Sequence, residues 1–328
     1  MSSTPPPPRR IAIVTGGTRG IGRGISEALA ATGEYSGFLL TYNTDKNTAE
    51  SFAATLRSGN VGNGLRVEIV GGDLSLKETR DAVFSKFDKS FHAHEGFELS
   101  AVVHNAGQYI GITSDNTEGF FAPPGQLLFG DGSLLAASAD GSPDLSTMKY
   151  YQRLYGDAYI DLCERGLDRM QRATERRRTL GNDIFPPFRG SLIGISGQGC
   201  NFNQRVSTSY DMPGSGKCVM EYAMRIFALR TAALGVNCNV IIPGVTRTDA
   251  WSRLEEKRGM PIGKLREMVV GGTVPMGEDI DPREIGDTVA FLCSATGGGR
   301  FITGVSLPVD GGLHLGKPPQ SSFRQGSK

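Results

Sequence analysis

The sequence predicts an α/β fold: one doubly wound parallel sheet of seven strands, flanked by helices in a single domain. Three observations predict it. Short apolar segments alternate with helical patterns along nearly the whole chain, a glycine-rich turn follows the first segment, and no second apolar core is evident. Such alternation is typical of parallel sheets that helices cover on both faces. The 328 residues are enough for one large domain of this kind.

Seven short apolar segments, each bounded by turn residues, are the predicted strands. They are residues 10–15, 37–42, 65–70, 99–103, 190–196, 236–242 and 304–309. Helical patterns lie between them, at 21–32, 46–58, 77–90, 148–173, 214–234 and 282–294. The predicted domain therefore covers residues 10–314. The tails at 1–9 and 315–328 are rich in Pro, Ser and Gly, and we expect them to be disordered.

Two connections are longer than the usual ~2–6 residues of such folds. Residues 108–147 form an insertion rich in Gly, Ser, Pro and Asp, either a wall of the pocket or a peripheral addition. Residues 244–281 follow the sixth strand and contain Trp251 and a charged helical piece, and we interpret them as a substrate lid. Both begin at carboxyl ends of strands, the edge at which open α/β sheets bind ligands.

The composition argues against several classes of protein. There are 35 Lys and Arg against 34 Asp and Glu, so neither a nucleic acid nor an anionic membrane is indicated as a partner. No apolar run is long enough to span a membrane and no secretion signal is evident, which favours a cytoplasmic protein. The five cysteines form no CxxC pair and the four histidines have no zinc-site spacing. We therefore expect reduced thiols and no metal.

The most informative stretch is the turn between the first strand and the first helix, where residues 15–22 read TGGTRGIG. Glycines let the backbone approach a bulky anion, and the start of the helix offers N–H groups and a positive dipole end. The expected ligand is the pyrophosphate of a dinucleotide. The residues of the turn that we expect to contact the cofactor are Gly16, Thr18, Arg19, Gly20 and Ile21.

Further motifs follow in order along the chain. Asp73-Leu74 follows the third strand, Asn105-Ala106-Gly107 the fourth, and residues 243–246 the sixth, while residues 301–304 and 309–312 flank the last strand. Together with the glycine turn, these motifs resemble the short-chain dehydrogenase/reductase superfamily over about residues 10–314. The resemblance implies a Rossmann-type fold, a nicotinamide cofactor and a homo-oligomeric oxidoreductase.

The same resemblance implies a place for each motif. In the family the acid after the third strand lies near adenine, the Asn-Ala-Gly segment stabilises the sheet beside the cofactor, and the loop after the sixth strand lies beside nicotinamide. The implied cofactor contacts are Asp73, Leu74, Asn105, Ala106, Gly107, Pro243, Gly244, Val245 and Thr246.

The end of the second predicted strand bears on the choice of cofactor. Enzymes that use NAD commonly carry an acid there, which binds the ribose hydroxyls and would repel a 2′-phosphate. This chain has Tyr42, Asn43 and Thr44 at that place, and the first acid is Asp45. Arg19 can pair with a 2′-phosphate, alongside hydrogen bonds from Asn43 or Thr44. We therefore expect NADP(H).

Hydride transfer to a carbonyl needs a proton donor for the developing alkoxide and a cation near that donor. In the family these are a tyrosine and a lysine spaced Y-x3-K, with a serine about thirteen residues before the tyrosine. The resemblance implies Tyr210 as general acid, Lys217 as the cation that binds ribose and tunes the acid, and Ser196 as the residue that orients the carbonyl. The predicted reaction is reduction of a ketone or 3-oxoacyl-type carbonyl, in a small molecule or an acyl thioester.

The spacing from Tyr210 to Lys217 departs from the family pattern, because it is Y-x6-K. Residues seven apart on a helix are separated by about 10.5 Å along its axis, against about 6 Å for residues four apart. Pro213 suits the first turn of a helix, so we expect Tyr210 just before the helix and Lys217 inside it.

This departure leaves alternatives open. Y-x6-K resembles the enoyl-acyl-carrier-protein reductases of the same superfamily, although those enzymes have a different glycine motif and lack an equivalent of Ser196. Reduction of an enoyl thioester is therefore an alternative. A third hypothesis is a sensor or scaffold that binds NADP without catalysis, and the retention of Ser196, Tyr210 and Lys217 argues against it.

Two more expectations come from the resemblance. Many ketoreductases of the family carry an asparagine near the position of Tyr155, but residues 148–173 contain none. A water relay there is either absent or rebuilt with Tyr155 or Asp157, and we favour a packing role for Tyr155.

In the family the helices that correspond to 148–173 and 214–234 commonly pair across a two-fold axis, which predicts a homodimer or homotetramer. The apolar positions that we expect on that surface are Val219, Tyr222, Ile226 and Phe227.

Overall fold

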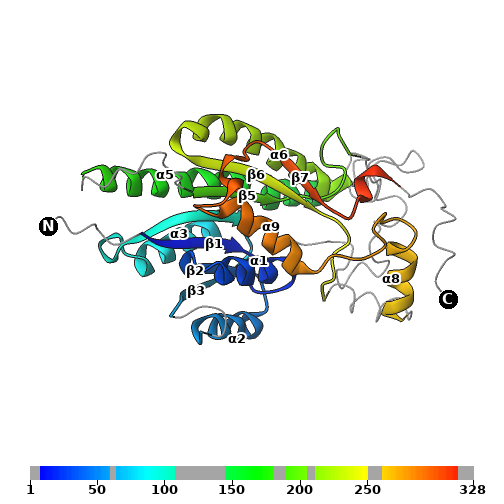
Figure 1. Cartoon of the computed structure of the whole chain (residues 1–328), viewed down its shortest axis with the longest axis horizontal. Coiled ribbons are helices and arrows are strands. Elements are labelled where there is room, and N and C mark those ends of the chain that lie inside the picture. The colour runs from blue at the N-terminus through cyan, green and yellow to red at the C-terminus, as the bar shows by residue number, and fades with distance from the viewer. Residues whose placement is uncertain are drawn as a thin grey trace.

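The computed structural model describes residues 8–59, 64–107, 145–179, 190–204, 211–249 and 261–316 of the chain. Within these residues the architecture is one sheet of seven parallel strands with helices on both faces (Figure 1). The strands are β1 (Arg9–Thr15), β2 (Tyr35–Tyr42), β3 (Arg66–Gly71), β4 (Phe97–His104), β5 (Gly190–Ile195), β6 (Val236–Pro243) and β7 (Ser306–Val309). The predicted fold class is confirmed.

The strand order across the sheet is β3-β2-β1-β4-β5-β6-β7. The chain first moves outward from β1 to β3, then returns to the other side of β1 with β4. Side chains and turns at the carboxyl ends of β1 and β4 therefore lie where the strand order reverses. Doubly wound sheets bind dinucleotides at such a point.

The helices match the six predicted segments closely, and two elements differ from the prediction. They are α1 (Gly20–Ala31), α2 (Lys46–Arg57), α3 (Lys77–Ser90), α4 (Ser146–Tyr151), α5 (Ala158–Thr179), α6 (Asp211–Thr231), α8 (Ile262–Val270) and α9 (Pro282–Cys293). One is a π-helical segment, η3 (Gln152–Asp157), which joins α4 to α5 where the sequence predicts one continuous α-helix. The other is α8, which matches none of the six predicted helices. Short 3-10 turns lie at Ala93–Glu95, Ala232–Leu234, Gly298–Phe301 and Leu313–Leu315.

Two apolar cores lie on opposite faces of the sheet. On β1, Ile11 and Ile13 join the core beneath α3, α5 and α6, whereas Ala12 and Val14 join the core beneath α1, α2 and α9. This alternation follows from the two-residue period of a strand. Because both faces are buried, the strands read as nearly continuous apolar runs. Each large side chain that is fully buried contributes about 1.5–3 kcal/mol to folding.

Two glycines set how closely α1 approaches α9. A Cβ on Gly24 would lie 2.4 Å from the Pro282 carbonyl oxygen, and one on Gly286 would lie 2.3 Å from the Gly24 carbonyl oxygen. The two helix backbones are therefore in contact, and no larger residue fits at either position. Asp281 and Glu284 form a capping box at the start of α9. These contacts hold α1, and with it the glycine turn, against the sheet.

Several predictions concern residues beyond those described. Residues 108–144 of the insertion, 250–260 of the lid with Trp251, and most of both tails lie outside the described ranges. The described part of residues 244–281 contains α8, at the end of the molecule toward which the strands point (Figure 1). Among the helices described, none combines the length and apolarity needed to cross a bilayer.

Asp279 links the loop after β6 to α8. Its carboxylate accepts hydrogen bonds from Arg247 (3.1 Å), which follows β6, and from Arg266 (2.5 Å) on α8. Burial acts to raise the pKa of Asp279, but these two guanidinium groups hold it below its ordinary value. The carboxylate therefore stays charged near neutral pH and fixes α8 relative to the loop after β6.

The predicted subunit surface on α6 is partly wrong. Val219, Tyr222 and Ile226 are exposed on α6, as expected for an interface. Phe227, however, is only 3% exposed and packs edge-on against Tyr159 in the core beneath α6. The helix periodicity does not by itself reveal which of two adjacent apolar positions, Ile226 or Phe227, faces the sheet.

Candidate active site

The glycine turn between β1 and α1 has a backbone that only glycine allows. Gly16 and Gly20 have φ values of 60° and 51°, in the left-handed region. A Cβ on Gly22 would lie 2.0 Å from the Gly16 carbonyl oxygen and 2.5 Å from Nδ2 of Asn105. Arg19 precedes α1 and caps no N–H group with its side chain. The start of α1 therefore presents backbone donors of the kind that bind an anion.

Thr15 and Asn105 lock the end of β1 to the end of β4. The Thr15 hydroxyl oxygen accepts the backbone N–H groups of Asn105 (3.0 Å) and Ala106 (2.9 Å). Nδ2 of Asn105 donates to the carbonyl oxygens of Thr15 (3.1 Å) and Gly16 (3.3 Å). Asn105 and Ala106 thus fix the glycine turn from the neighbouring strand, which agrees with the role that the resemblance implies.

His104 carries this network to the π-helical segment. Because Thr15 Oγ1 already accepts two N–H groups, its own proton goes to Nδ1 of His104 (3.0 Å), and Nε2 then donates to the Leu154 carbonyl (2.9 Å). Burial lowers the pKa of His104 to about 4, so the ring is neutral near pH 7. π-Helical turns often occur at functional sites. In this one Tyr155 directly follows Leu154, whose carbonyl accepts the hydrogen bond from His104.

The end of β2 has the groups expected for a 2′-phosphate. Asn43, Thr44 and Arg19 are exposed, and the Tyr42 ring covers Gly71 on β3, where a Cβ would lie 2.7 Å from the ring. Asp45 caps α2, and its oxygens accept from the backbone and the hydroxyl of Thr48. These hydrogen bonds lower the pKa of Asp45, and the charge of nearby Arg19 lowers it further.

A tyrosine that sequence reasoning missed contacts Asp73. Asp73 follows β3 and accepts the backbone N–H of Ser75 (2.8 Å). The Tyr150 hydroxyl on α4 also bonds to Asp73; burial first, and then the Asp73 charge, raises the pKa of Tyr150 to about 12. Leu74 is 2% exposed and packs in the core. Nothing in the local sequence distinguishes Tyr150 from its neighbours. Its partner Asp73 is far away along the chain, so the sequence alone does not identify this contact.

Lys217 lies between the end of β5 and the π-helical segment. Its ammonium donates to the Ser196 carbonyl oxygen (2.9 Å) and lies 4.9 Å from the centre of the Tyr155 ring. Tyr155 in turn stacks on Tyr151, and a Cβ on Gly107 would lie 3.0 Å from its hydroxyl. Tyr155 is buried and packed, as favoured, and its ring also faces the cation expected in the active site.

The Ser196 hydroxyl is directed to a buried acid. It donates to Oε1 of Glu221 (2.5 Å), whose other oxygen accepts from Nδ2 of Asn201 (2.8 Å) and from the Ser306 hydroxyl (2.8 Å). Glu221 is 4% exposed. One carboxylate thus joins the end of β5, the loop after it and β7, and three donors compensate its burial.

Glu221 was missed by the sequence analysis, although one signal could have found it. It lies one helical turn after Lys217, on the face of α6 that packs against the sheet, where an acid needs partners. The predicted role of Ser196 in orienting a carbonyl stays a prediction. Gly197, not Ser196, lies thirteen residues before Tyr210.

Tyr210 lies outside the described residues. Helix α6 begins at the next residue, Asp211, so Lys217 lies inside the helix as predicted. Pro213 occupies the position four residues before Lys217, where a Y-x3-K protein would have its tyrosine. No hydroxyl is available at that place, so the predicted acid belongs to the segment ahead of the helix.

The loop after β6 reaches the glycine turn. Gly244 packs against Asp310, where a Cβ would lie 2.6 Å from the Asp310 Cα. Thr246 donates to the Gly244 carbonyl (3.0 Å) and pairs with Ile280, which also bonds to the carbonyl of Val245. Farther along, Thr248 is the nearest neighbour of a Cβ on Gly20, at 3.5 Å. Pro243 to Thr246 therefore lie at the same sheet edge as the turn.

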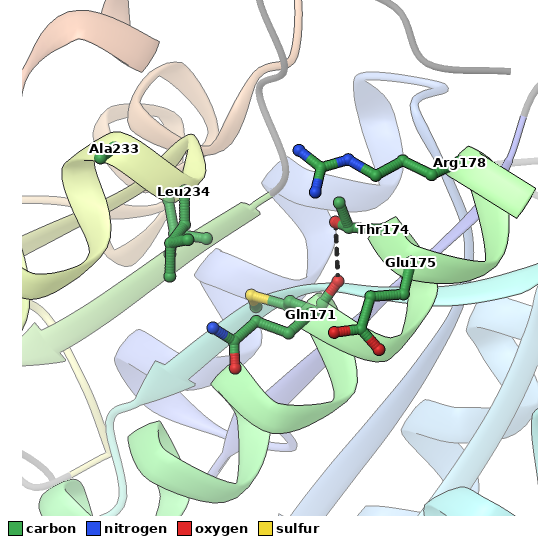
Figure 2. Close-up of a pocket in the computed structure, with 8 residues that line it drawn as sticks. Gln171, Thr174, Glu175, Arg178, Ala233 and Leu234 are labelled. Carbon is green, nitrogen blue, oxygen red and sulfur yellow. Dashed lines mark hydrogen bonds between the residues drawn. The ribbon is translucent and has the colours of Figure 1, made fainter.

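A cavity of about 120 Å³ lies elsewhere in the molecule (Figure 2). It is lined by Met170, Gln171, Thr174, Glu175, Arg178, Ala233, Leu234 and Val236. Val236 begins β6, so this cavity is at the amino end of the strands, opposite the glycine turn. Within the described residues, no group of three or more His, Cys, Asp or Glu side chains could hold a metal ion.

Comparison with known proteins identifies the family. A model described as short chain dehydrogenase matches residues 10–119, and one described as Enoyl-(Acyl carrier protein) reductase matches residues 166–314. The chain belongs to the short-chain dehydrogenase/reductase superfamily, whose members are NAD(P)-dependent oxidoreductases. The predicted family is confirmed.

Three similar proteins illustrate the range of relatives. The 3-oxoacyl-[acyl-carrier-protein] reductase FabG of Haemophilus influenzae is 27% identical, over 93% of this chain and 98% of its own. The 1-cyclohexenylcarbonyl-CoA reductase of Streptomyces collinus is 24% identical, over 95% of this chain and 89% of its own. The structure of L-sorbose reductase from Gluconobacter frateurii with NADPH and L-sorbose superposes with a TM-score of 0.68 at 20% identity, over 93% and 97% of the two chains.

Proposed function

We propose that this protein is an NADPH-dependent reductase of ketone or 3-oxoacyl-type carbonyl groups, with Tyr210 as general acid. The observation that carries the proposal is the position of Lys217. Its buried ammonium lies at the carboxyl end of β5, held by the Ser196 carbonyl and the Tyr155 ring. The similarity to a 3-oxoacyl-[acyl-carrier-protein] reductase over nearly the whole chain supports the class of substrate.

The residues present fit a dinucleotide. There is no room for a Cβ at Gly22, and the backbone of Gly16 and Gly20 is left-handed, so the start of α1 is open to a pyrophosphate. In the proposal Thr18 and Ile21 complete that turn. Asp73 and Leu74 would lie near adenine, residues 105–107 would stabilise the sheet beside the cofactor, and residues 243–246 would lie beside nicotinamide.

NADPH, not NADH, is the proposed cofactor. Asn43 and Thr44 offer donors at the end of β2, and Arg19 offers a positive charge beside them. The nearest acid, Asp45, already accepts two hydrogen bonds from Thr48 as the cap of α2. Its carboxylate is therefore less available to bind ribose hydroxyls. The similar L-sorbose reductase structure contains NADPH, which agrees with this choice.

Bound NADPH supplies the hydride, and the side chains of this chain handle the proton. In the proposal Tyr210 donates its phenolic proton to the carbonyl oxygen as negative charge develops there. In the proposal the positive charge of Lys217 favours the phenolate that results. The Ser196 hydroxyl has a single proton, so it must turn from Glu221 toward the substrate to orient the carbonyl.

Reduction of an enoyl thioester is a second candidate. Two observations favour it: the Y-x6-K spacing, and the match of residues 166–314 to a family model described as Enoyl-(Acyl carrier protein) reductase. The third hypothesis, an NADP-binding sensor or scaffold without catalysis, has no observation in its favour beyond the altered spacing.

Turnover measurements separate these functions. Consumption of NADPH is followed with a panel of ketones and 3-oxoacyl thioesters, and in parallel with enoyl thioesters of matched chain length. The proposal predicts turnover on the first panel and a preference for NADPH over NADH. Turnover on enoyl thioesters alone would establish the second candidate, and NADPH binding without turnover on either panel would favour the third.

We also propose a cytoplasmic homodimer or homotetramer. All five cysteines are free thiols, which suits a reducing compartment. Val219, Tyr222 and Ile226 expose an apolar strip on α6 that a second copy can cover. Light scattering at micromolar concentration is expected to give twice or four times the monomer mass. Monomer alone would contradict this assembly.

A further inference from the structure

Two cysteines from different elements meet beside Lys217. Cys200 lies in the loop 197–204 after β5 and is 4% exposed, whereas Cys218 is an exposed residue of α6. The Cys218 sulfur donates to the carbonyl oxygen of Cys200 itself at 3.0 Å. The two thiol groups also form a hydrogen bond with each other. The two side chains are therefore neighbours in the folded protein, although eighteen positions separate them in the sequence.

The loop holds Cys200 against α6 by contacts that involve no sulfur. Asn201 donates to Glu221 on α6 (2.8 Å), and its own side-chain oxygen accepts the N–H of Asn203 (3.0 Å). The Gln204 side chain accepts the N–H of Gly199 (2.8 Å). The two sulfurs therefore stay close without a covalent link between them.

The environments of the two thiols differ in the way that a reactive pair requires. The hydrogen bond from the Cys200 thiol lowers the pKa of Cys218 to about 7. The same hydrogen bond, together with burial, raises the pKa of Cys200. Near neutral pH an appreciable fraction of Cys218 is thiolate, the form that attacks oxidants, while Cys200 keeps its proton.

We propose that Cys200 and Cys218 are a modification site at which peroxide forms a reversible disulfide within the chain. The Cys218 thiolate attacks one oxygen of hydrogen peroxide, the O–O bond breaks, and hydroxide leaves, which gives a sulfenic acid. The Cys200 sulfur then attacks the Cys218 sulfur. The S–S bond forms, the S–O bond breaks, and the hydroxyl leaves as water with the Cys200 proton. One peroxide is reduced to two waters, and two thiols are oxidised to one disulfide.

The disulfide would change the neighbourhood of Lys217. Cys218 is the next residue on α6, and Cys200 follows Ser196, whose carbonyl accepts the Lys217 ammonium. A covalent S–S bond is shorter than the contact between two thiols, so it draws the loop and the helix together. We expect weaker NADPH binding and slower turnover in the oxidised protein. This consequence rests on the proposed function, whereas formation of the disulfide does not.

The test treats the native full-length protein with hydrogen peroxide and measures its intact mass without reductant. The expected result is a loss of two hydrogens, a cross-linked peptide that contains Cys200 and Cys218, and full reversal by dithiothreitol. Cys200→Ser is expected to stop at a sulfenic acid that dimedone traps on Cys218. Cys218→Ser is expected to leave Cys200 as a thiol. Cys163→Ser, at a buried cysteine of α5, is the matched control and should still form the disulfide.

Other results would overturn the proposal. They are a disulfide between the Cys218 residues of two copies, equal oxidation of the buried Cys163, Cys238 and Cys293, or oxidation of the Cys200–Cys218 pair only after denaturation. NADPH turnover is measured on the same samples before and after reduction. If the reduced protein has no turnover on carbonyl substrates, the proposed function fails, and the mass measurement still decides the disulfide.

Discussion

Two regions meet at the carboxyl end of the sheet, the proposed cofactor side at β1 and β4 and the proposed catalytic side at β5 and α6, and they are built in different ways. On the cofactor side, backbone geometry fixes the site: Gly16 has a left-handed backbone, Gly22 has no room for a Cβ, and Asn105 holds both strands together. On the proposed catalytic side, side chains fix the site. Lys217 depends on the Ser196 carbonyl and the Tyr155 ring, and neither contact follows from a short motif.

This difference explains why the two sides follow the family pattern to different degrees. Glycine is the default residue where a backbone must approach a pyrophosphate closely. A glycine motif in the sequence therefore predicts this part of the site directly. A proton donor can reach the same reacting atom from several places on a helix or a loop. A Y-x6-K spacing is therefore compatible with the proposed catalytic role, and that role must be tested by substitution.

Loss of the proposed acid should have the largest effect. Tyr210→Phe is expected to lower turnover by about 10²–10⁴-fold, because general acid catalysis contributes that much. The dissociation constant of NADPH should not change, since only proton transfer is lost. Steady-state kinetics and cofactor titration are the measurements. Tyr222→Phe, at an exposed tyrosine of α6, is the control and should match the parent.

Near-normal turnover by Tyr210→Phe would contradict the assignment. The proton would then come from another group, and the enoyl or non-catalytic hypotheses would gain. Such a result would also leave the proposed catalytic side without the tyrosine on which its assignment to carbonyl reduction depends.

The junction between the two sides should respond to pH. The ordinary pKa of a histidine is 6.5, which applies to His104 in the unfolded chain, and burial lowers the pKa of His104 to about 4 in the folded protein. Between these pH values the unfolded chain binds more protons, so the free energy of unfolding falls as pH drops, by about 3 kcal/mol in total. Chemical denaturation from pH 7 to 4 is the measurement.

His104→Gln isolates that contribution. Its stability is expected to change less than that of the parent over this range, while His94→Gln, at an exposed ring, should follow the parent. Equal pH dependence in all three proteins would show that His104 does not stay neutral in the fold.

The cofactor side should be intolerant of a single methyl group. In Gly22→Ala the added Cβ would meet the Gly16 carbonyl oxygen at 2.0 Å. Such overpacking costs about 1–3 kcal/mol. Both the melting temperature and the affinity for NADPH should fall. Gly298→Ala is the matched control, because nothing lies within 4 Å of its Cβ. If Gly22→Ala binds NADPH normally, the turn does not hold the pyrophosphate.

A smaller effect should distinguish the two cofactors. Arg19→Ala is expected to weaken NADPH by about tenfold and NADH hardly at all. An exposed charge-assisted hydrogen bond contributes near the low end of about 1.5–3 kcal/mol. Arg23→Ala, an exposed arginine of α1 that pairs with Glu27, is the control. Equal weakening of both cofactors, or a preference of the parent for NADH, would refute the role of Arg19.

Much of the fold could be predicted from the sequence, because its signals are local. The seven strands are short apolar runs between turn residues, and the glycine turn is a continuous motif. The π-helical segment was not predicted. It coincides with a bond from His104 to the Leu154 carbonyl, fifty positions along the chain, and nothing in residues 152–157 shows that partner.

In the candidate site, too, residues in local motifs could be predicted, whereas contacts with partners far along the chain could not. Gly16 and Asn105 were found from motifs, and the structure places them together. The direction of the Ser196 hydroxyl was not predicted, since its acceptor Glu221 is twenty-five positions away and Ser306 lies farther still. Phe227 was placed on the wrong face of α6 for a related reason. Helical periodicity locates the buried apolar face of a helix only to within about one residue.

The central claim is that hydride goes to a carbonyl carbon. The most direct test supplies NADPH deuterated at the transferring position together with a 3-oxoacyl thioester, and locates the label by mass spectrometry and NMR. We expect one deuterium on the carbon that carries the new hydroxyl group, with none transferred by Tyr210→Phe above its residual rate. Deuterium found only at the β-carbon of a saturated product from an enoyl thioester, with the 3-oxoacyl thioester unchanged, would contradict it.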